Sequence, residues 1–418
     1  MGAWGRSSFA SRTLWGPWAA LPALAVYVFV MLRDDAPWRG DPMWTADGMG
    51  IGLFLIGPLV AGATAMDASR LTAWRGVFLA GATPRSYTVY VRAMLWSCTP
   101  IAAIHLLAYI IGLCVGGASL AVFDPLNLGT IFTQLLAIFW FGSTGSMLGR
   151  FVQPVLAGVV GAGFALAATY TLGLAGVGAA HGFALLDLGG ATVPQLGLEY
   201  PAHYLGWQVI LLAVMATVSL FMPVRFKGRR VQLFWPPPTV MGIIALIACV
   251  FVGLSAGPGD RKMLAAPRPP TNCMGINPTI CLYSEQKRVA GEVDARLRKL
   301  VQGAQDAGYG ALSPARIEQR TSSYKPQGLR TFSLRIDPSA LDDASWDQDA
   351  MQAMLQPNCP MVYGEEPPPE GYFLRMNDLV FTWSQIAGLD PGDFSSGMRL
   401  TKSETADTLA AWARCELS

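Results

Sequence analysis

Apolar stretches dominate the chain as far as residue 256, and short polar segments separate them. A helix needs about 20 apolar residues to cross the hydrocarbon core of a membrane. Seven stretches are close to that length, so residues 1–256 are predicted to form an all-α transmembrane domain of about seven helices. The predicted spans are 14–32, 49–66, 93–116, 127–147, 153–175, 205–223 and 236–256.

The first apolar stretch follows Arg6 and Arg12, an arrangement that also occurs in signal peptides. The residues at its end, from 32 to 35, are Leu-Arg-Asp-Asp. They do not provide the small residues at which a signal peptide is cleaved. We therefore predict that the first stretch is retained as a transmembrane helix.

Lysine and arginine fall mostly on one side of the predicted spans. With a cytoplasmic N-terminus, only Arg33 and Arg39 lie outside, and eleven basic residues lie inside. These eleven are Arg6, Arg12, Arg70, Arg75, Arg85, Arg92, Arg150, Arg225, Lys227, Arg229 and Arg230. Cytoplasmic loops carry an excess of Lys and Arg. The chain is therefore predicted to be a multi-pass plasma-membrane protein with a cytoplasmic N-terminus, and seven spans place everything after residue 256 outside.

Residues 257–418 have the charge density of a soluble domain, with 17 basic and 20 acidic residues. The formal net charge of the whole chain is only +2, and its basic excess lies in the membrane half, where orientation explains it. A nucleic-acid partner is therefore not expected. A segment rich in Pro and Gly, 257–272, is predicted to link the last span to a small extracytoplasmic domain, 273–418.

The extracytoplasmic domain is predicted to be of the α+β class, because both helical and strand-like patterns occur in it. The predicted elements are an amphipathic helix at 284–305, a strand at 330–336 and helices near 376–388 and 402–414. Thr401 or Ser403 is expected to cap the last helix.

Four of the seven cysteines lie in this domain: Cys273, Cys281, Cys359 and Cys415. An even number of cysteines on an oxidising side of the membrane indicates two disulfides. Of the three possible pairings we prefer Cys273 with Cys281, which closes a short loop and leaves Cys359 with Cys415. A zinc site is the alternative use of four cysteines, although the chain contains no C-x-x-C motif. The other three cysteines lie in predicted spans and are expected to act as small apolar side chains.

Motifs for catalysis are missing from the sequence. The C-terminal domain has no histidine, no G-x-S-x-G and no H-E-x-x-H, and the whole chain has no G-x-x-x-x-G-K-[ST] for binding ATP. We therefore expect neither an enzyme nor a cofactor or metal site. The acidic cluster of Glu365, Glu366 and Glu370 lies among prolines and is interpreted as a solvated loop, with calcium binding as the alternative.

His105 lies near the middle of the third predicted span, where an ionisable residue is a functional candidate by default. The interpretation that we favour is a neutral imidazole that hydrogen-bonds a neighbouring helix, for instance Thr133 or Gln134 of the fourth span. No second buried charge suggests a proton relay. The fifth span is rich in small residues between Ala157 and Gly163, which permit close packing of helices.

The longest predicted cytoplasmic segment, 67–92, combines basic and apolar residues. It begins with Asp67-Ala68-Ser69-Arg70, continues through a basic and apolar stretch around Arg75, and turns at Thr83-Pro84 before Arg85. Taken alone, this pattern is typical of an amphipathic segment that lies on the membrane surface.

The same segment resembles the membrane permease subunits of ABC-2-type ABC transporters, especially those of actinobacteria. In those subunits a D-A/S-x-R stretch follows the second span, and a helix and an A-T-P-R-type turn come after it. The resemblance implies that this region contains the coupling helix, which docks on the ATPase subunit. The residues it assigns to the docking region are Asp67, Arg70, Arg75, Thr83, Pro84 and Arg85.

The resemblance covers residues 1–223. It implies that residues 1–13 form an interfacial helix and that the stretch 176–204 contains short re-entrant helices. The implied function is a transmembrane subunit that pairs with a second copy or a related permease in the lipid bilayer and depends on a separate ATPase. The seventh span and the disulfide-bearing domain lie outside the resemblance. They favour, as the alternative, a membrane-anchored extracytoplasmic binding or sensory protein, and an ectoenzyme comes third.

Overall fold

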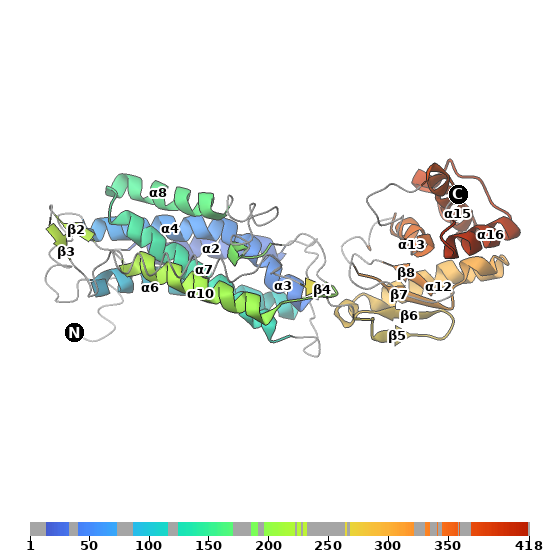
Figure 1. Cartoon of the computed structure of the whole chain (residues 1–418), viewed down its shortest axis with the longest axis horizontal. Helices are drawn as coiled ribbons and strands as arrows, with labels where there is room; N and C mark the ends of the chain where they lie inside the picture. Colours follow the sequence, from blue (N-terminus) through green and yellow to red (C-terminus); the bar gives the residue numbers. More distant parts are fainter. Residues whose placement is uncertain are drawn as a thin grey trace. The chain divides into compact units, whose positions relative to one another are not determined.

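The structure of the chain is a computed structural model (Figure 1). It describes residues 14–32, 41–72, 87–115, 124–169, 185–190, 196–221, 224–226, 229–231, 264–265, 268–321, 331–334, 341, 345–357, 359 and 369–416. The chain divides into two compact units. The membrane unit comprises Met1–Val193 and Tyr200–Leu264, and the C-terminal unit comprises Pro194–Glu199 and Ala265–Ser418. The division between Leu264 and Ala265 falls inside the stretch that was expected to be a linker.

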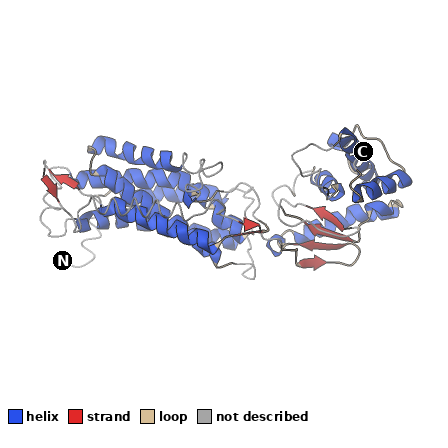
Figure 2. Ribbon diagram, in the orientation of Figure 1, coloured by secondary structure: helices blue, strands red, loops and turns tan. Residues whose placement is uncertain are grey.

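The membrane unit is a bundle of apolar helices (Figures 1 and 2). A short 3₁₀ helix, η1 (Gly16–Ala19), leads into α2 (Ala20–Leu32), and the short helix α3 (Pro42–Gly48) leads almost directly into α4 (Gly50–Thr72). The other helices of the bundle are α6 (Tyr87–Val115), α7 (Leu126–Gly149), α8 (Pro154–Ala167) and α10 (Ala202–Phe221).

Short strands accompany the bundle. The strands β2 (Val224–Phe226) and β3 (Arg229–Val231) form an antiparallel pair at one end of the bundle, and α3 lies at the other end (Figure 1). Two further strands of two residues each, β1 (Leu198–Glu199) and β4 (Leu264–Ala265), lie at the points of the sequence where the chain passes from one unit to the other.

Four helices of the described residues are long and apolar enough to cross a membrane. They are Pro42–Thr72, Val89–Val115, Leu126–Gly149 and Ala202–Leu220, and two shorter apolar helices occupy Gly16–Val30 and Leu156–Ala167. These six helices coincide with six of the seven predicted spans, and the predicted span 236–256 lies outside the described residues. Helices of this length and composition identify a membrane protein, whereas the count of seven spans stays a prediction.

Small residues bring α4 into close contact with α7 and α8. On α7, a methyl group added to Gly145 or Gly149 would overlap the backbone carbonyls of Ala61 and Ala65 in α4. On α8, a Cβ added to Gly161 would lie 2.6 Å from the carbonyl oxygen of Ala61. Helices can approach this closely only where side chains are absent. The small residues of the fifth predicted span therefore serve helix packing.

The C-terminal unit is built on a four-stranded mixed sheet (Figure 2). Its strands, in spatial order, are β5 (Asn272–Met274), β6 (Thr279–Leu282), β7 (Arg316–Gln319) and β8 (Thr331–Leu334). The pair β5–β6 is antiparallel, and the pairs β6–β7 and β7–β8 are parallel. Parallel strands need a crossover connection, and α12 (Ala290–Asp306) provides it between β6 and β7.

Further helices complete the core of the C-terminal unit. They are α13 (Trp346–Leu355), α15 (Glu370–Ala387) and α16 (Lys402–Ala413), with the 3₁₀ turns η5 (Ser284–Gln286), η6 (Gly310–Leu312) and η8 (Gly392–Phe394). Trp383 of α15 is completely buried, and its indole N–H donates to the carbonyl oxygen of Leu300 in α12 at 3.2 Å. The Tyr309 hydroxyl donates to the carbonyl oxygen of Leu400 at 3.1 Å. These two buried polar groups are thus paired with backbone groups.

The combination of helices and a mixed sheet confirms the α+β class. The predicted helix at 284–305 starts later than expected, at Ala290, because η5 comes before it. The helix expected near 376–388 starts earlier, at Glu370, and the last helix begins after Thr401 as expected. Helix α13 and the strands β5 to β7 were not predicted.

Both preferred cysteine pairs are disulfide-bonded in the structure, Cys273 with Cys281 and Cys359 with Cys415. The first pair lies directly opposite on the antiparallel strands β5 and β6. This pairing favours the two disulfides over the zinc alternative, because a disulfide sulfur is not a thiolate ligand.

Candidate functional site

A buried carboxylate at the end of α4 fastens three helices of the membrane unit to one another. Asp67 accepts hydrogen bonds from the backbone N–H groups of Trp15 at 2.7 Å and Gly16 at 2.8 Å, at the start of η1. The hydroxyl of Ser97 in α6 also donates to it, at 3.4 Å. The carboxylate therefore accepts hydrogen bonds from free backbone N–H groups at the start of η1, as an N-cap side chain does, although it belongs to a different helix.

Arg70, one turn further along α4, strengthens the same junction. Its guanidinium lies 5.3 Å from the centre of the Trp15 ring, which is within the range of a cation–π contact. Asp67 is 1% exposed, whereas Arg70 is exposed. Of these two, Arg70 presents its side chain at the surface of the unit, and Asp67 acts inside the chain.

The remaining residues of the implied docking region lie outside the described residues. They are Arg75, Thr83, Pro84 and Arg85, in the stretch 73–86. The structure therefore describes the two ends of the segment, at Thr72 in α4 and Tyr87 in α6, and the junction at Asp67.

His105 lies in a chain of hydrogen bonds that crosses the membrane unit. Its Nδ1 is bonded to the Tyr27 hydroxyl of α2, and its Nε2 lies 2.9 Å from Oε1 of Gln134 in α7. The amide nitrogen of Gln134 donates to the carbonyl oxygens of Ala46 at 3.0 Å and Leu188 at 2.9 Å. Gln134 is one of the two partners that the sequence suggested for this histidine.

The direction of each bond in this chain follows from the amide of Gln134. Its NH₂ group donates to two carbonyls, so its oxygen must accept, and Nε2 of His105 must carry the proton. Nδ1 is then an acceptor, and the Tyr27 hydroxyl donates to it. Both ring nitrogens of a neutral imidazole are satisfied in this way. The geometry supports the interpretation of His105 as a neutral structural residue of α6, which is hydrogen-bonded to α2 and α7.

Polar groups also hold the junction between α3 and α4, at the far end of the bundle from β2 and β3. Asp41 caps α3 by accepting from the next two backbone amides after Pro42, at 2.9 and 3.0 Å. The backbone N–H of Gly190 donates to the carbonyl of Asp47 at 2.7 Å, and Gln208 of α10 donates to the carbonyl of Asp187 at 2.8 Å. The stretch 185–190 is thereby fixed to the bundle.

Sequence reasoning did not identify this junction. Gly189 and Gly190 adopt φ angles of 111° and 104°, which glycine tolerates best, and a Cβ on Gly189 would overlap the carbonyl of Asp47. The available signal was the Asp41-Pro42 pair, since Asp at an N-cap followed by Pro is a common start of a helix.

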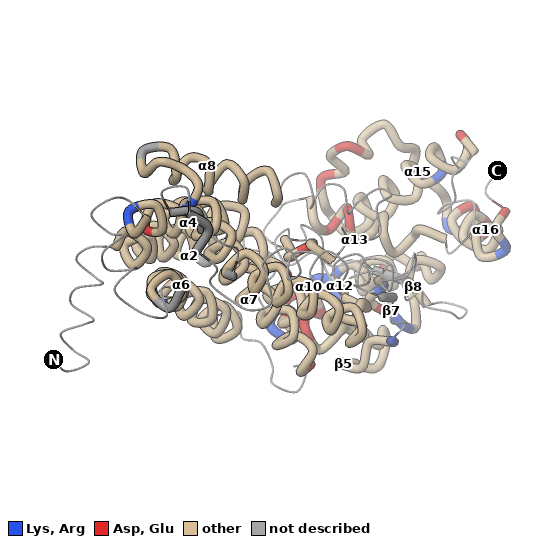
Figure 3. Tube along the Cα trace, turned by 60° about the vertical axis from the view of Figure 1, so that its left-hand side comes forward, with Lys and Arg blue, Asp and Glu red and all other residues tan. Residues whose placement is uncertain are grey.

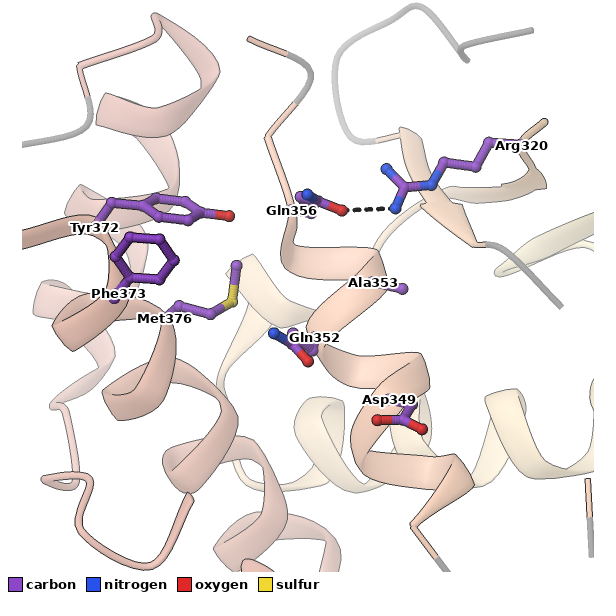
Figure 4. A pocket seen from close by; sticks show the side chains of 8 residues that line it. All are labelled: Arg320, Asp349, Gln352, Ala353, Gln356, Tyr372, Phe373 and Met376. Carbon is purple, nitrogen blue, oxygen red and sulfur yellow. Dashed lines mark hydrogen bonds between the residues drawn. The ribbon is translucent and has the colours of Figure 1, made fainter. Parts of the chain in front are cut away.

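The C-terminal unit contains a cleft of about 410 Å³ between the end of β7, the helix α13 and the start of α15 (Figure 4). Its lining residues are Arg320, Asp349, Gln352, Ala353, Gln356, Tyr372, Phe373 and Met376. The guanidinium of Arg320 donates to Oε1 of Gln356 at 2.6 Å. Clefts of about 300–1,000 Å³ that combine apolar walls with a few polar groups are the usual shape of small-molecule sites.

The second disulfide anchors two walls of this cleft. Cys359 follows Gln356 by three residues, and Cys415 follows Trp412 by three residues. The ring of Trp412 in turn packs against the ring of Tyr372, with 5.0 Å between the centroids. The bond between Cys359 and Cys415 therefore restrains the end of α13 against the start of α15.

Acidic residues do not form a metal site in the part of the chain that the structure describes, where no group of three or more candidate ligands comes together. Glu370 is exposed at the start of α15, and the other two members of its cluster, Glu365 and Glu366, lie outside the described residues. Charged residues, blue and red along the Cα trace, are sparse in the helices of the membrane unit and frequent in the C-terminal unit (Figure 3).

No protein-family model, no curated protein and no solved structure matches this chain.

Proposed function

We propose that this protein is the transmembrane permease subunit of an ABC-2-like transporter. A separate ATPase subunit hydrolyses ATP, and this chain, with a second copy or a related permease, moves a substrate across the plasma membrane. The proposal places the N-terminus and the segment 67–92 in the cytoplasm, with seven spans and an extracytoplasmic C-terminal unit. The distribution of basic residues supports this orientation.

The observation that carries the proposal is the junction at Asp67. The segment 67–92 connects α4 with α6, and Asp67, at its start, is hydrogen-bonded to the first residues of η1 and to Ser97 of α6. A displacement of this segment is therefore passed to three helices together. Two-state rearrangements in proteins are transmitted through such rigid, packed elements.

Helix α4 extends this coupling into the bundle. Its contacts with Gly145 and Gly149 of α7 and with Gly161 of α8 leave no room for sliding without a clash of backbones. The helices α4, α7 and α8 therefore move as one body when the segment 67–92 is pushed. An ATPase that docks on this segment and changes conformation would therefore displace most of the helices around the pathway.

Docking can be tested with a charge-reversal pair and a matched control. Arg75→Glu with Arg85→Glu places negative charges where the ATPase is expected to present acidic groups, and such juxtaposition costs several kcal/mol. Arg229→Glu with Arg230→Glu makes the same charge change in another predicted cytoplasmic segment. Tagged protein is purified from native membranes, and copurifying subunits with a P-loop are identified by mass spectrometry.

We expect the first pair to lose the ATPase and its ATP hydrolysis, and the control pair to keep both. Insertion should survive in both variants, because nine inside basic residues still outnumber two outside ones. If the first pair retains its ATPase and activity, the arginines only anchor the segment to lipid. That result, or a wild-type protein that copurifies with no ATPase, favours the membrane-anchored extracytoplasmic binding or sensory protein.

A further inference from the structure

The cleft of the C-terminal unit has two walls of different chemical character (Figure 4). Helix α13 presents the carboxylate of Asp349 and the amides of Gln352 and Gln356. Helix α15 presents the ring of Phe373 and the thioether of Met376 opposite them. A ligand that fits between these walls must be polar along one side and apolar on the other.

The polar groups are spread along the wall. Asp349 and Gln352 are three residues apart on α13, and Gln356, the C-cap residue directly after the helix, follows four residues later, which continues the same face. The seven steps from the first to the last of these residues span about 10 Å, at 1.5 Å per residue. Ligand groups are therefore contacted at several points along a line and not at one end.

The charges of the lining balance. Arg320 contributes one positive charge and Asp349 one negative charge, so the formal charge of the lining is zero and selects neither an anion nor a cation as a whole. The amide of Gln352 offers both donors and an acceptor, and the amide of Gln356, whose Oε1 accepts from Arg320, offers its NH₂ donors. This combination suits neutral hydroxyl groups, which donate and accept at the same time.

The apolar wall offers an exposed aromatic ring. Phe373 is 56% exposed, an unusually large fraction for a ring that lines a cleft. Beside it, Tyr372 is almost completely buried and is supported from behind by Trp412. The rings of Tyr372 and Phe373 meet edge to face, at an interplanar angle of 72°, so the apolar C–H face of a ring-shaped ligand can cover the exposed Phe373 ring alone.

We propose that this cleft binds a short neutral carbohydrate. A sugar ring has hydroxyl groups around its edge and a C–H face, and a chain of such rings repeats both along its length. A nucleobase is the competing flat ligand, but its polar atoms lie in the plane of a single short ring system and do not extend along a wall of this length. The proposal does not depend on the transport function, because the cleft is formed within the C-terminal unit alone.

Binding is tested on the full-length protein in detergent or lipid nanodiscs. The probes are maltose, cellobiose and lactose, with adenosine and a charged dipeptide as competing classes, and ligand-observed NMR or tryptophan fluorescence gives the Kd. We expect at least one of the three sugars to bind below about 10 mM, which is a weak but measurable affinity. Loss of the ring in Phe373→Ala should weaken this binding by about tenfold or more.

Leu374→Ala is the matched control, because Leu374 follows Phe373 on the same helix, is 62% exposed and does not line the cleft. It should leave the Kd unchanged, while Gln356→Ala should weaken binding as Phe373→Ala does. Intact disulfides and an unchanged elution volume show that each variant is folded. The proposal is overturned if folded wild type binds none of the three sugars, if only adenosine or the dipeptide binds, or if Phe373→Ala and Leu374→Ala behave alike.

Discussion

The two units of this chain obtain close packing by opposite means. In the membrane unit, glycines such as Gly145 and Gly161 let the helix backbones touch, since lipid tails are as apolar as the side chains and the hydrophobic effect does not drive helices together. In the C-terminal unit, large side chains such as Trp383 fill the core, because burying them removes apolar surface from water.

The two units also differ in the links that tie their elements together. The membrane unit satisfies His105 through Gln134 and backbone carbonyls inside the bundle, as a medium without water requires. The C-terminal unit adds covalent bonds instead, since two disulfides restrain its loops. Each unit should therefore be sensitive to a different kind of substitution.

The largest effect is expected from the longer disulfide. Cys359→Ala with Cys415→Ala opens a loop with a sequence separation of 56 residues, and losing such a bridge costs about 2–5 kcal/mol. Removing the bridge between Cys273 and Cys281, which are only 8 residues apart, should cost less because the closed loop is shorter. Urea unfolding followed by tryptophan fluorescence measures both, and an equal or reversed order would contradict the loop-length argument.

The second prediction concerns the contact between α8 and α4. Gly161→Ala forces a methyl group against the carbonyl of Ala61, and overpacking of this kind costs about 1–3 kcal/mol. Gly163→Ala is the control, because a Cβ there meets nothing within 4 Å, and alanine favours a helix more than glycine does. The detergent-solubilised protein is heated, and the monomer that remains is measured by gel filtration. The temperature at which half of the monomer is lost should fall only for Gly161→Ala.

Sequence patterns predicted the helices of the membrane unit, but they did not predict the contacts between those helices. Runs of apolar residues located six helices that the structure describes, because a span needs length and composition only. The short helix α3 (Pro42–Gly48), which ends just before the predicted start of the second span at residue 49, was not predicted, since its seven residues are too few to show a helical period. The role of Asp67 as a cap for η1 was also missed, because its partners Trp15 and Gly16 are about 50 residues away in the sequence.

In the C-terminal unit, long periodic elements were predicted and short ones were not. Helix α12 shows five apolar positions on one face, but β5, β6 and β7 have only three or four residues each, too few for an alternation to be read. The cleft was not foreseen either. Its lining comes from three elements, and neither Arg320 nor Phe373 belongs to a motif, so only folding brings them together.

The third prediction tests the hydrogen-bond chain of the membrane unit. Gln134→Leu removes the acceptor of the His105 Nε2–H and leaves the carbonyls of Ala46 and Leu188 without this donor, which should cost about 1–3 kcal/mol for the buried groups left unpaired. Thr133→Val is the control, because the Thr133 hydroxyl donates only to the carbonyl of Thr130 in its own helix, at 2.8 Å. If the two variants lose their folded monomer at the same temperature, the hydrogen bonds through His105 and Gln134 have no structural role.

The smallest effect is expected at the start of α16, where a capping box operates on the exposed surface of the C-terminal unit. Glu404 accepts hydrogen bonds from the backbone N–H of Thr401 at 2.8 Å and from its hydroxyl at 2.7 Å. These bonds favour the carboxylate and lower the pKa of Glu404 below its usual range. The contribution to stability is therefore complete above the unfolded-state pKa of about 4.3 and is lost as the pH falls through the lower folded-state pKa.

Glu404→Gln should accordingly speed hydrogen exchange in the first turn of α16 at pH 7, by no more than a few-fold because the group is exposed. At a pH below the folded-state pKa, Glu404 is protonated in the wild type as well, so wild type and variant should exchange at the same rate. Thr401→Ala, which removes the reciprocal bond to the backbone N–H of Glu404 at 3.3 Å, should speed exchange at both pH values, because a hydroxyl acceptor does not titrate. If Glu404→Gln changes the exchange rate by the same factor at pH 7 and below the folded-state pKa, the carboxylate charge contributes nothing to the cap.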